Sequence, residues 1–216
     1  MARPRTHHEE KKQELIKIAF ELFMKNGYEN TSIQDIMHAA QISKGAMYHY
    51  FECKEDILDA VLHFIIDQDV KQFETVFNNP SLTVLEKLTA TMLIDKSKAP
   101  EEVKQATEYV MERKDSIFDY RARELSKSRS IQGLTSLIRE GVAKGEFHTA
   151  YPEEMAVFIA ISGQSVGELF IRQASKEALL HAIDLFIQLI ANCLGLEKKE
   201  QDFLADFLYK QFEKTE

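Results

Sequence analysis

Residues that make turns, cross-links and membrane spans are scarce in this 216-residue sequence. Its eight glycines and four prolines are too few for the frequent turns of a β-sandwich or β-barrel. The two cysteines, Cys53 and Cys193, lie far apart without a Cys-x-x-Cys motif, so we expect reduced, unpaired thiols. The longest uninterrupted apolar run, residues 155–161, is far shorter than the ~20 residues of a membrane span. These absences exclude a turn-rich β fold and a disulfide scaffold, and they predict no membrane helix.

Targeting and catalytic motifs are missing as well. The first ten residues have no apolar stretch of the kind that a secretory signal needs, so we expect a cytoplasmic protein. The sequence has no His-Glu-x-x-His, Gly-x-Ser-x-Gly, phosphate-binding glycine-rich or dinucleotide-binding motif. None of its seven histidines has a glutamate three residues before it, as helical di-iron sites require. We therefore expect no enzymatic activity, no metal and no cofactor.

The distribution of charge is more informative than its total of −8. Residues 1–54 carry eight basic and seven acidic side chains, whereas residues 55–216 carry 19 basic and 28 acidic ones. The acidity therefore lies outside the N-terminal quarter. Within that quarter, no acidic residue occurs between Asp35 and Glu52. A segment free of carboxylates in an acidic chain is suited to contact with phosphate groups.

Residues 31–54 have the pattern of two short helices joined by a tight turn. Thr31 or Ser32 can cap the first helix through its hydroxyl. Each is followed three residues later by a side chain, Gln34 or Asp35, that suits a reciprocal capping box. One face of this helix is apolar at i, i+3 and i+4 spacing, through Ile33, Ile36 and Met37.

The second helix is expected to follow Ser43, a good N-cap, and to run from Lys44 to about Phe51. Its inward side chains would be Ala46, Met47 and Phe51, and its outward residues would be Lys44, Gly45, Tyr48 and His49, with Tyr50 beside them. A recognition helix places such N-terminal residues against base edges in the major groove. Lysine can donate to guanine or to phosphate, tyrosine hydroxyls suit phosphate oxygens, and glycine lets the backbone approach the DNA closely.

Lys54, at the expected start of the next helix, is suited to a further phosphate contact. A Tyr-x-Tyr-Phe run at helical spacing could instead be plain core. The capped turn, the lysine, the histidine and the missing carboxylates favour a DNA-binding surface. The predicted DNA-contacting residues are Thr31, Ser32, Ile33, Ser43, Lys44, Gly45, Ala46, Tyr48, His49, Tyr50 and Lys54.

An ordered set of residues between Ile18 and Val61 supports this interpretation. The set comprises Ala19, Leu22, Phe23, Gly27, Tyr28, Thr31, Ser32, Ile33, Asp35, Ile36, Ala39, Ala40, Ile42, Ser43, Lys44, Gly45, Tyr48, His49, Tyr50, Phe51, Lys54, Glu55 and Leu58. It resembles the DNA-binding domain of the TetR family of bacterial transcriptional regulators, although Met37 and Cys53 depart from the usual pattern. The resemblance implies a homodimeric repressor whose operator binding is relieved by a small ligand held among later helices.

Helical periodicity continues to the end of the sequence, and nothing alternates with period two for long enough to need a strand. A helix from His8 to Asn26 precedes the motif, and a long helix from Lys54 to about Phe77 follows it. Further helices are expected at 83–97, 101–113, 115–126, 130–144, 153–173, 177–194 and 198–213. The predicted fold is all-α, with a helix-turn-helix DNA-binding domain at 1–53 and a helical ligand-binding and dimerisation domain at 54–216.

The expected helices 153–173 and 177–194 are apolar around most of their circumference, so each must be buried on two sides. A line of small residues on the first of them permits close helix approach. We predict a four-helix dimer interface formed by Ala156, Ala160, Gly163, Gly167, Ile183, Phe186, Ile187 and Ile190. An internal core pair is the alternative. A homodimer also matches a palindromic operator, whose half-sites are related by a two-fold axis.

A ligand of the C-terminal domain is expected from the resemblance, and abundant Phe and Met would suit an apolar or aromatic inducer. The candidate lining residues are Phe73, Phe77, Met92, Tyr109, Met111, Phe118, Phe158 and Phe170, with Gln164 or Glu168 as polar anchors. Each of these could equally be plain core. The leading hypothesis is therefore a ligand-responsive, homodimeric repressor bound to a double-stranded DNA operator. The alternative is a helical ligand-binding or protein-interaction module without sequence-specific DNA binding.

Overall fold

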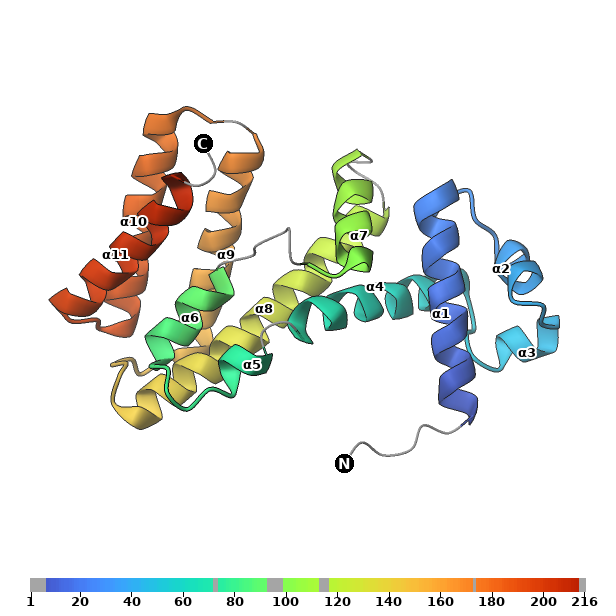
Figure 1. The fold of residues 1–216 in the computed structure, drawn as a ribbon, viewed down its shortest axis with the longest axis horizontal. Helices are drawn as coiled ribbons and strands as arrows, with labels where there is room; N and C mark the ends of the chain where they lie inside the picture. The colour runs from blue at the N-terminus through green and yellow to red at the C-terminus, as the bar shows by residue number, and fades with distance from the viewer. Residues whose placement is uncertain (1–6, 72–73, 93–98, 113–116, 173, 214–216) are drawn as a thin grey trace. The chain divides into compact units, whose positions relative to one another are not determined.

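The computed structural model describes residues 7–71, 74–92, 99–112, 117–172 and 174–213. All regular elements among these residues are α-helices, which confirms the all-α prediction (Figure 1). Their bounds are α1 His7–Asn26, α2 Ile33–Ala39, α3 Lys44–Tyr48, α4 Lys54–Lys71, α5 Glu74–Phe77, α6 Val84–Met92, α7 Glu101–Glu112, α8 Ile117–Lys144, α9 Pro152–Ile171, α10 Lys176–Leu194 and α11 Lys198–Glu213.

Most predicted helices begin and end within a few residues of these bounds, and the clearest error lies in α8. Separate helices were expected at 115–126 and 130–144, but α8 is one continuous helix through the residues between them. Serine and glycine inside a helix cost only about 0.5–1 kcal/mol each relative to alanine, which packing along the helix outweighs. The expected long helix from Lys54 to about Phe77 is helical over its described residues, as α4 and α5.

The chain divides by packing into two compact units. The first comprises Met1–Gln72 with Lys96–Leu125, and the second comprises Phe73–Asp95 with Ser126–Glu216. The N-terminal unit therefore contains α1 to α4, α7 and the first turns of α8. The expected division after residue 53 is a functional one, and it stays a prediction; α7 nevertheless packs with the helix-turn-helix.

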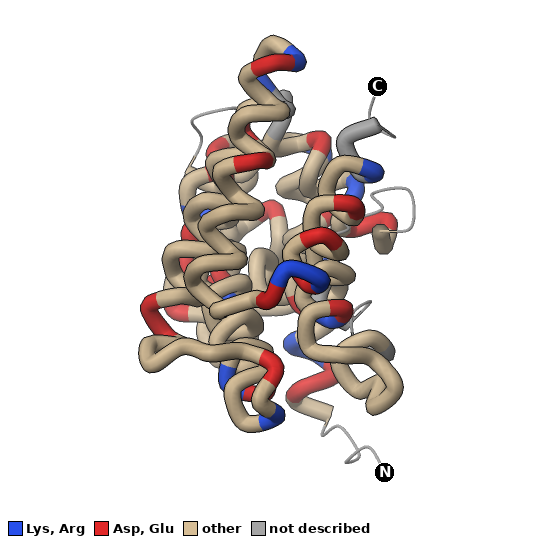
Figure 2. Tube along the Cα trace, turned by 90° about the vertical axis from the view of Figure 1, so that its left-hand side faces the viewer, with Lys and Arg blue, Asp and Glu red and all other residues tan. Residues whose placement is uncertain are grey.

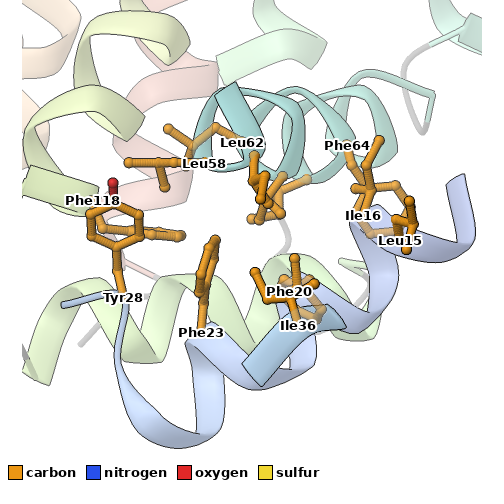
Figure 3. Close-up of a cluster of buried hydrophobic side chains, with 14 of the residues drawn as sticks. Leu15, Ile16, Phe20, Phe23, Tyr28, Ile36, Leu58, Leu62, Phe64 and Phe118 are labelled. Atoms are coloured by element: carbon orange, nitrogen blue, oxygen red, sulfur yellow. The ribbon is translucent and has the colours of Figure 1, made fainter. Parts of the chain in front are cut away.

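The core of the N-terminal unit is a single apolar cluster contributed by all of its helices (Figure 3). Its fully buried members include Leu15, Phe23, Ile36, Met47, Leu58, Val61 and Phe118. A long-range hydrogen bond adds to this packing, because the Tyr28 backbone N–H donates to Tyr109 Oη at 3.0 Å. In addition, Arg121 on α8 pairs with Asp59 on α4 at 2.6 Å. The α7–α8 segment is therefore part of the structure that holds α1.

The C-terminal unit has its own core, built mainly from α6, α8, α9, α10 and α11. Helix α10 is the one described helix that is long and apolar enough to cross a membrane by length and composition. Seven of its residues are buried in this core: Leu179, Ile183, Phe186, Ile187, Ile190, Ala191 and Leu194. Helix packing therefore accounts for the inward part of its apolar surface.

Candidate nucleic-acid interface

Helix α2 begins with the capping arrangement that the sequence predicts for Ser32 and Asp35. The Ser32 hydroxyl accepts the Asp35 backbone N–H at 3.1 Å, and the Asp35 carboxylate accepts the Ser32 backbone N–H at 2.8 Å. The hydrogen bonds from the Ser32 side chain and backbone hold the pKa of Asp35 below its usual value. The one carboxylate at the start of α2 is thus committed to a local structural role.

Thr31 is not at the DNA surface, contrary to the prediction. Its side chain is fully buried, and its hydroxyl donates to the Gly27 carbonyl at 2.8 Å. Thr31 therefore ties the end of α1 to the start of α2, and the alternative cap with Gln34 is not used. Ile33 is half-buried against the core, so only part of its side chain is accessible.

The turn between α2 and α3 contains an unusual backbone conformation that sequence reasoning missed. Gln41 has φ +52°, in the left-handed region that L-residues other than Gly, Asn and Asp rarely occupy. The Ile42 N–H donates back to the Met37 carbonyl at 3.1 Å and closes the turn. A glutamine carries no sequence signal for this conformation, which explains why it was not predicted.

Helix α3 is one short turn held in place from below. The Ser43 hydroxyl caps it by accepting the Ala46 N–H at 3.3 Å. Met47 is fully buried and Phe51 nearly so, which confirms their predicted inward direction. Ala46 is half-buried. A five-residue helix is too short to be stable alone, so these core anchors determine where its outer surface lies.

The outer surface of α3 carries the predicted residues. Lys44, Gly45 and His49 are exposed, Tyr48 is 47% exposed, and Tyr50 is half-buried. A Cβ added at Gly45 would meet no atom within 4 Å, so the backbone at this point is open to a partner. The Lys44 ammonium lies 5.8 Å from the centre of the Tyr48 ring, which keeps cation and ring on one surface.

Helix α1 adds residues to this surface that the sequence analysis did not assign. The His8 ring lies 4.7 Å from Tyr50 and 5.1 Å from His49, measured between ring centres. One turn along, the Lys12 ammonium lies 5.4 Å from the centre of the Phe51 ring. The sequence signal for this contribution was a histidine and a lysine four residues apart on one face of α1. Nothing in the sequence showed that this face meets α3.

Lys54, at the start of α4, is placed beside the loop that follows α1. Its ammonium donates to the Glu29 carbonyl at 3.3 Å and lies 4.2 Å from the centre of the Tyr28 ring. Burial, and then the charge of Glu55, raise the pKa of Tyr28 to about 12, so this phenol stays neutral. A lysine ammonium has three donors, and a phosphate contact by Lys54 stays a prediction.

The predicted ligand-lining residues do not converge. Tyr109 and Phe118 are buried in the core of the N-terminal unit, with ring centres 4.9 Å apart, so their assignment to a C-terminal pocket is wrong. Phe158 and Gln164 are exposed, and Glu168 pairs with Arg172 at 3.6 Å. Phe77 and Met92 are half-buried and pack against the C-terminal core. Phe73 and the side chains of Met111 and Phe170 lie outside the described residues.

The predicted dimer residues lie largely inside one chain, which corrects that assignment. Five of them are buried in the C-terminal core: Ala156, Ile183, Phe186, Ile187 and Ile190. A Cβ added at Gly163 would lie 3.2 Å from the tip of Phe186, so the small-residue line lets α9 and α10 of the same chain approach closely. Ala160 is half-buried, and Gly167 remains exposed. For the buried residues, α9 and α10 therefore form the internal core pair that the sequence analysis gave as the alternative to a dimer interface.

Two capped helices joined by a tight turn, with the second helix anchored from below and open above, define a helix-turn-helix protein. A model of the TetR family, described as bacterial regulatory proteins, matches residues 15–61. Over these residues the chain is similar to the DNA-binding domain of the TetR family.

Curated relatives are similar to part of the chain. The chain is 41% identical over 69 residues to YuxN, an uncharacterized HTH-type transcriptional regulator of Bacillus subtilis, covering 32% of this chain and 23% of YuxN. It is 26% identical over 141 residues to KstR2, an HTH-type transcriptional repressor of Mycolicibacterium smegmatis, covering 63% of this chain and 67% of KstR2. The chain thus spans about a quarter of the length of YuxN.

Solved structures extend the likeness of fold to nearly the whole chain. A TetR-family regulator from Syntrophomonas wolfei superposes with a TM-score of 0.57 at 21% identity, covering 89% of this chain and 99% of that one. A TetR-family regulator from Cytophaga hutchinsonii gives a TM-score of 0.55 at 18% identity, covering 90% and 100%. At these identities the likeness concerns the fold alone.

Proposed function

We propose that this protein is a homodimeric transcriptional repressor that binds a palindromic DNA operator and is released from it by a small molecule. The observation that carries the proposal is the outer surface of α3. Lys44, Gly45, Tyr48 and His49 face solvent there, while Met47 fixes the helix on the core. No carboxylate occurs between Asp35 and Glu52 to repel a phosphate.

Each exposed residue of α3 has a role that its chemistry supports. Lys44, at the helix N-terminus, donates to guanine acceptors in the major groove or to a flanking phosphate. Gly45 allows close backbone approach. The hydroxyls of Tyr48 and Tyr50 donate to phosphate oxygens and set the register of the protein on the duplex without reading sequence.

The subunit contact is proposed on the outer face of α9 and α10. No Asp, Glu, Lys or Arg occurs in α9 between Glu154 and Glu168, and Asp184 is the one such residue between Glu177 and Glu197. These uncharged stretches are tan in Figure 2. The face exposes large apolar side chains, namely Phe158, Ile161 and Leu185. Exposed apolar side chains on neighbouring uncharged helices are typical of a protein–protein interface.

The subunit contact can be tested by placing a charge in it. Leu185 is 67% exposed, so Leu185→Glu leaves the core of the chain intact. We expect this variant to be monomeric at concentrations at which the wild type is dimeric, as measured by light scattering after size exclusion. Ser136→Glu, at an exposed position on α8, is the control and should stay dimeric. Equal masses for all three proteins would contradict an α9–α10 interface.

Release by a ligand is proposed to act through α7 and the first turns of α8, which belong to the same unit as the helix-turn-helix. Tyr109 on α7 accepts a hydrogen bond from Tyr28, and Arg121 near the start of α8 pairs with Asp59 on α4. α8 then continues beyond the N-terminal unit as one helix. A small apolar or aromatic molecule that favours one position of α7 and α8 would bias the position of α3. A coupling of about 1–3 kcal/mol would change operator affinity about 5- to 150-fold.

The experiment that tests the function is selection of bound DNA fragments by the full-length protein, followed by titration of an enriched fragment at several salt concentrations. Binding through phosphates must weaken with salt, with a slope of about −0.9 per contact. We expect Tyr48→Ala and Lys44→Ala to lower affinity about 10-fold or more without changing the thermal melting curve. A protein without salt-dependent DNA binding would instead be an interaction or ligand-binding module.

A further inference from the structure

The first turn of α1 and the end of α3 meet in a cluster of three aromatic side chains. The His8 ring centre lies 4.7 Å from Tyr50 and 5.1 Å from His49, and the last two rings are 5.5 Å apart. His8 and His49 are both exposed, whereas Tyr50 is half-buried. A helix outside the helix-turn-helix therefore contributes an imidazole next to the one at the end of α3.

We propose that His8 and His49 together form a proton-linked binding site for one phosphodiester group of the DNA backbone. The inference rests on the proposed function, because its ligand is part of the operator. The His8 and His49 rings meet edge to face at 86° with 5.1 Å between their centres, and both side chains are exposed, so one small anion can approach the two rings together. Tyr50 is the positioning residue, since its ring packs against both histidines and holds His8 beside α3.

The charged groups on the α1 side of this site are of both signs, and the first turn of α1 holds Glu9 and Glu10. Lys11 and Lys12 follow His8 by one helical turn. Lys11 is already paired with Glu14 at 2.9 Å. Lys12 points its ammonium over a ring of the same corner, 5.4 Å from the centre of Phe51. Glu9, the next residue after His8, is the acidic neighbour in sequence.

The charged groups on the α3 side are likewise of both signs. Lys44 lies over the Tyr48 ring on the same short helix. Glu52 follows Phe51, and its backbone N–H donates to Asp56 at 3.0 Å, at the beginning of α4. A proton added to His8 or His49 therefore joins a corner of mixed charge, and a phosphate between the two rings adds a negative charge that stabilises the protonated forms.

A phosphate between the two imidazoles would favour their protonated forms and would accept an N–H from each ring. The DNA complex then holds more protons than the free protein and free DNA. By linkage, affinity rises as pH falls through the range in which histidine side chains titrate, around pH 6–7. Operator binding would thus carry a pH dependence that comes from the two histidines.

The test measures the affinity of the full-length protein for a DNA fragment that the wild type enriches from a random pool. Fluorescence anisotropy at about pH 6 and about pH 8 gives the pH profile, and a salt series at the lower pH gives the number of phosphate contacts. For the wild type we expect a steeper gain on acidification, up to about tenfold per pH unit for each proton taken up. His8→Phe keeps a ring against Tyr50 but cannot be protonated, so its profile should be flatter and its salt slope smaller by about one.

His63→Phe is the matched control, because His63 is an exposed histidine on α4 and the change is the same. It should keep the wild-type profile and slope. His8→Ala removes both the ring and the charge, whereas His8→Phe removes only the charge. If His8→Ala lowers affinity while His8→Phe keeps the wild-type pH profile and salt slope, His8 acts by packing alone, and the proposal is overturned. A flattened profile in both His8→Phe and His63→Phe also overturns it. A wild type that enriches no DNA refutes the proposed function itself, a result distinct from either of these.

Discussion

The helix-turn-helix and the C-terminal unit hold their helices by contacts of different range. In the helix-turn-helix, the Ser32–Asp35 and Ser43–Ala46 hydrogen bonds join residues three apart. The C-terminal unit also has local caps, but it adds contacts between distant segments. The Val84 N–H at the start of α6 donates to Glu146 at 2.6 Å, 62 residues away.

This difference in range decides what each region tolerates. A local cap survives changes elsewhere in the protein, whereas a distant partner is lost when either segment moves. Lys87, buried on α6, illustrates the second case, because its ammonium pairs with Glu140 on α8 at 2.8 Å. The C-terminal unit should therefore be the more sensitive of the two to single substitutions at its segment contacts.

The largest expected effect comes from filling the contact between Gly141 and Phe147. A Cβ at Gly141 would overlap the Phe147 ring, which is almost fully buried. Gly141→Ala should therefore lower the free energy of unfolding by about 1–3 kcal/mol through overpacking, as measured by urea denaturation.

Gly133→Ala is the control for this prediction, on the same helix. A Cβ there would meet nothing within 4 Å, so the substitution should instead stabilise α8 by about 0.5–1 kcal/mol. If both alanine substitutions change the free energy of unfolding in the same direction, the contact between the Phe147 ring and α8 does not explain the effect at Gly141.

A second effect is expected from the buried ion pair between α6 and α8. Hydrogen bonds from Lys144 and Lys87 lower the pKa of Glu140. Because the folded-state pKa is lowered, this stabilisation is present above the ordinary glutamate pKa of about 4.3 and is lost as pH falls below it. Glu140→Gln should destabilise the unit by about 1–3 kcal/mol at neutral pH, since the buried Lys87 keeps its charge without an anionic partner.

The measurement for Glu140 is urea denaturation between about pH 7 and pH 3, and the difference between wild type and Glu140→Gln should shrink toward acid. Glu153→Gln is the surface control, because the Arg139–Glu153 pair is exposed and its removal should cost little. A wild-type advantage that stays constant with pH would mean that the carboxylate charge is not what stabilises α6 against α8.

The smallest effect is expected in the helix-turn-helix, at Gln41. Its left-handed backbone costs about 1–2 kcal/mol for an L-residue, and glycine avoids most of this cost but is more flexible when unfolded. Gln41→Gly should therefore raise the free energy of unfolding by about 0.5–1 kcal/mol, as read from thermal melting. Gln41→Val, with a β-branched side chain at the same φ, should lower it, and a stabilising valine would show that the turn relaxes to another conformation.

Sequence predicted the helix-turn-helix well because its signals are local. The helix starts are indicated by the capping residues Ser32, Asp35 and Ser43. The burial of Met47 and Phe51 follows from helical spacing. Thr31 was misassigned because a hydroxyl next to a cap has two possible partners, and the chosen one, the Gly27 carbonyl, depends on how α1 ends. His8 was missed because only the packing of α1 beside α3 gives it neighbours.

The same reasoning was weaker for the C-terminal helices, because an apolar face shows that a residue is buried but not against what. Phe186 and Ile190 were expected to meet a second subunit, yet they pack within their own chain. Tyr109 was expected to line a ligand pocket, yet it belongs to the core beside Tyr28. Partners of this kind are set by tertiary contacts between segments that are distant in sequence.

The place of Tyr109 and Phe118 has a practical consequence for anyone who builds chimeric regulators. A cassette cut after residue 53 would lack the buried side chains that α4, α7 and α8 contribute to the same apolar core as Phe23 and Tyr28. Such a fragment would expose apolar surface and aggregate, however well its α3 sequence is chosen. A transplantable DNA-binding domain must therefore combine two stretches of the gene. The first reaches the end of α4, and the second encodes α7 with the first turns of α8.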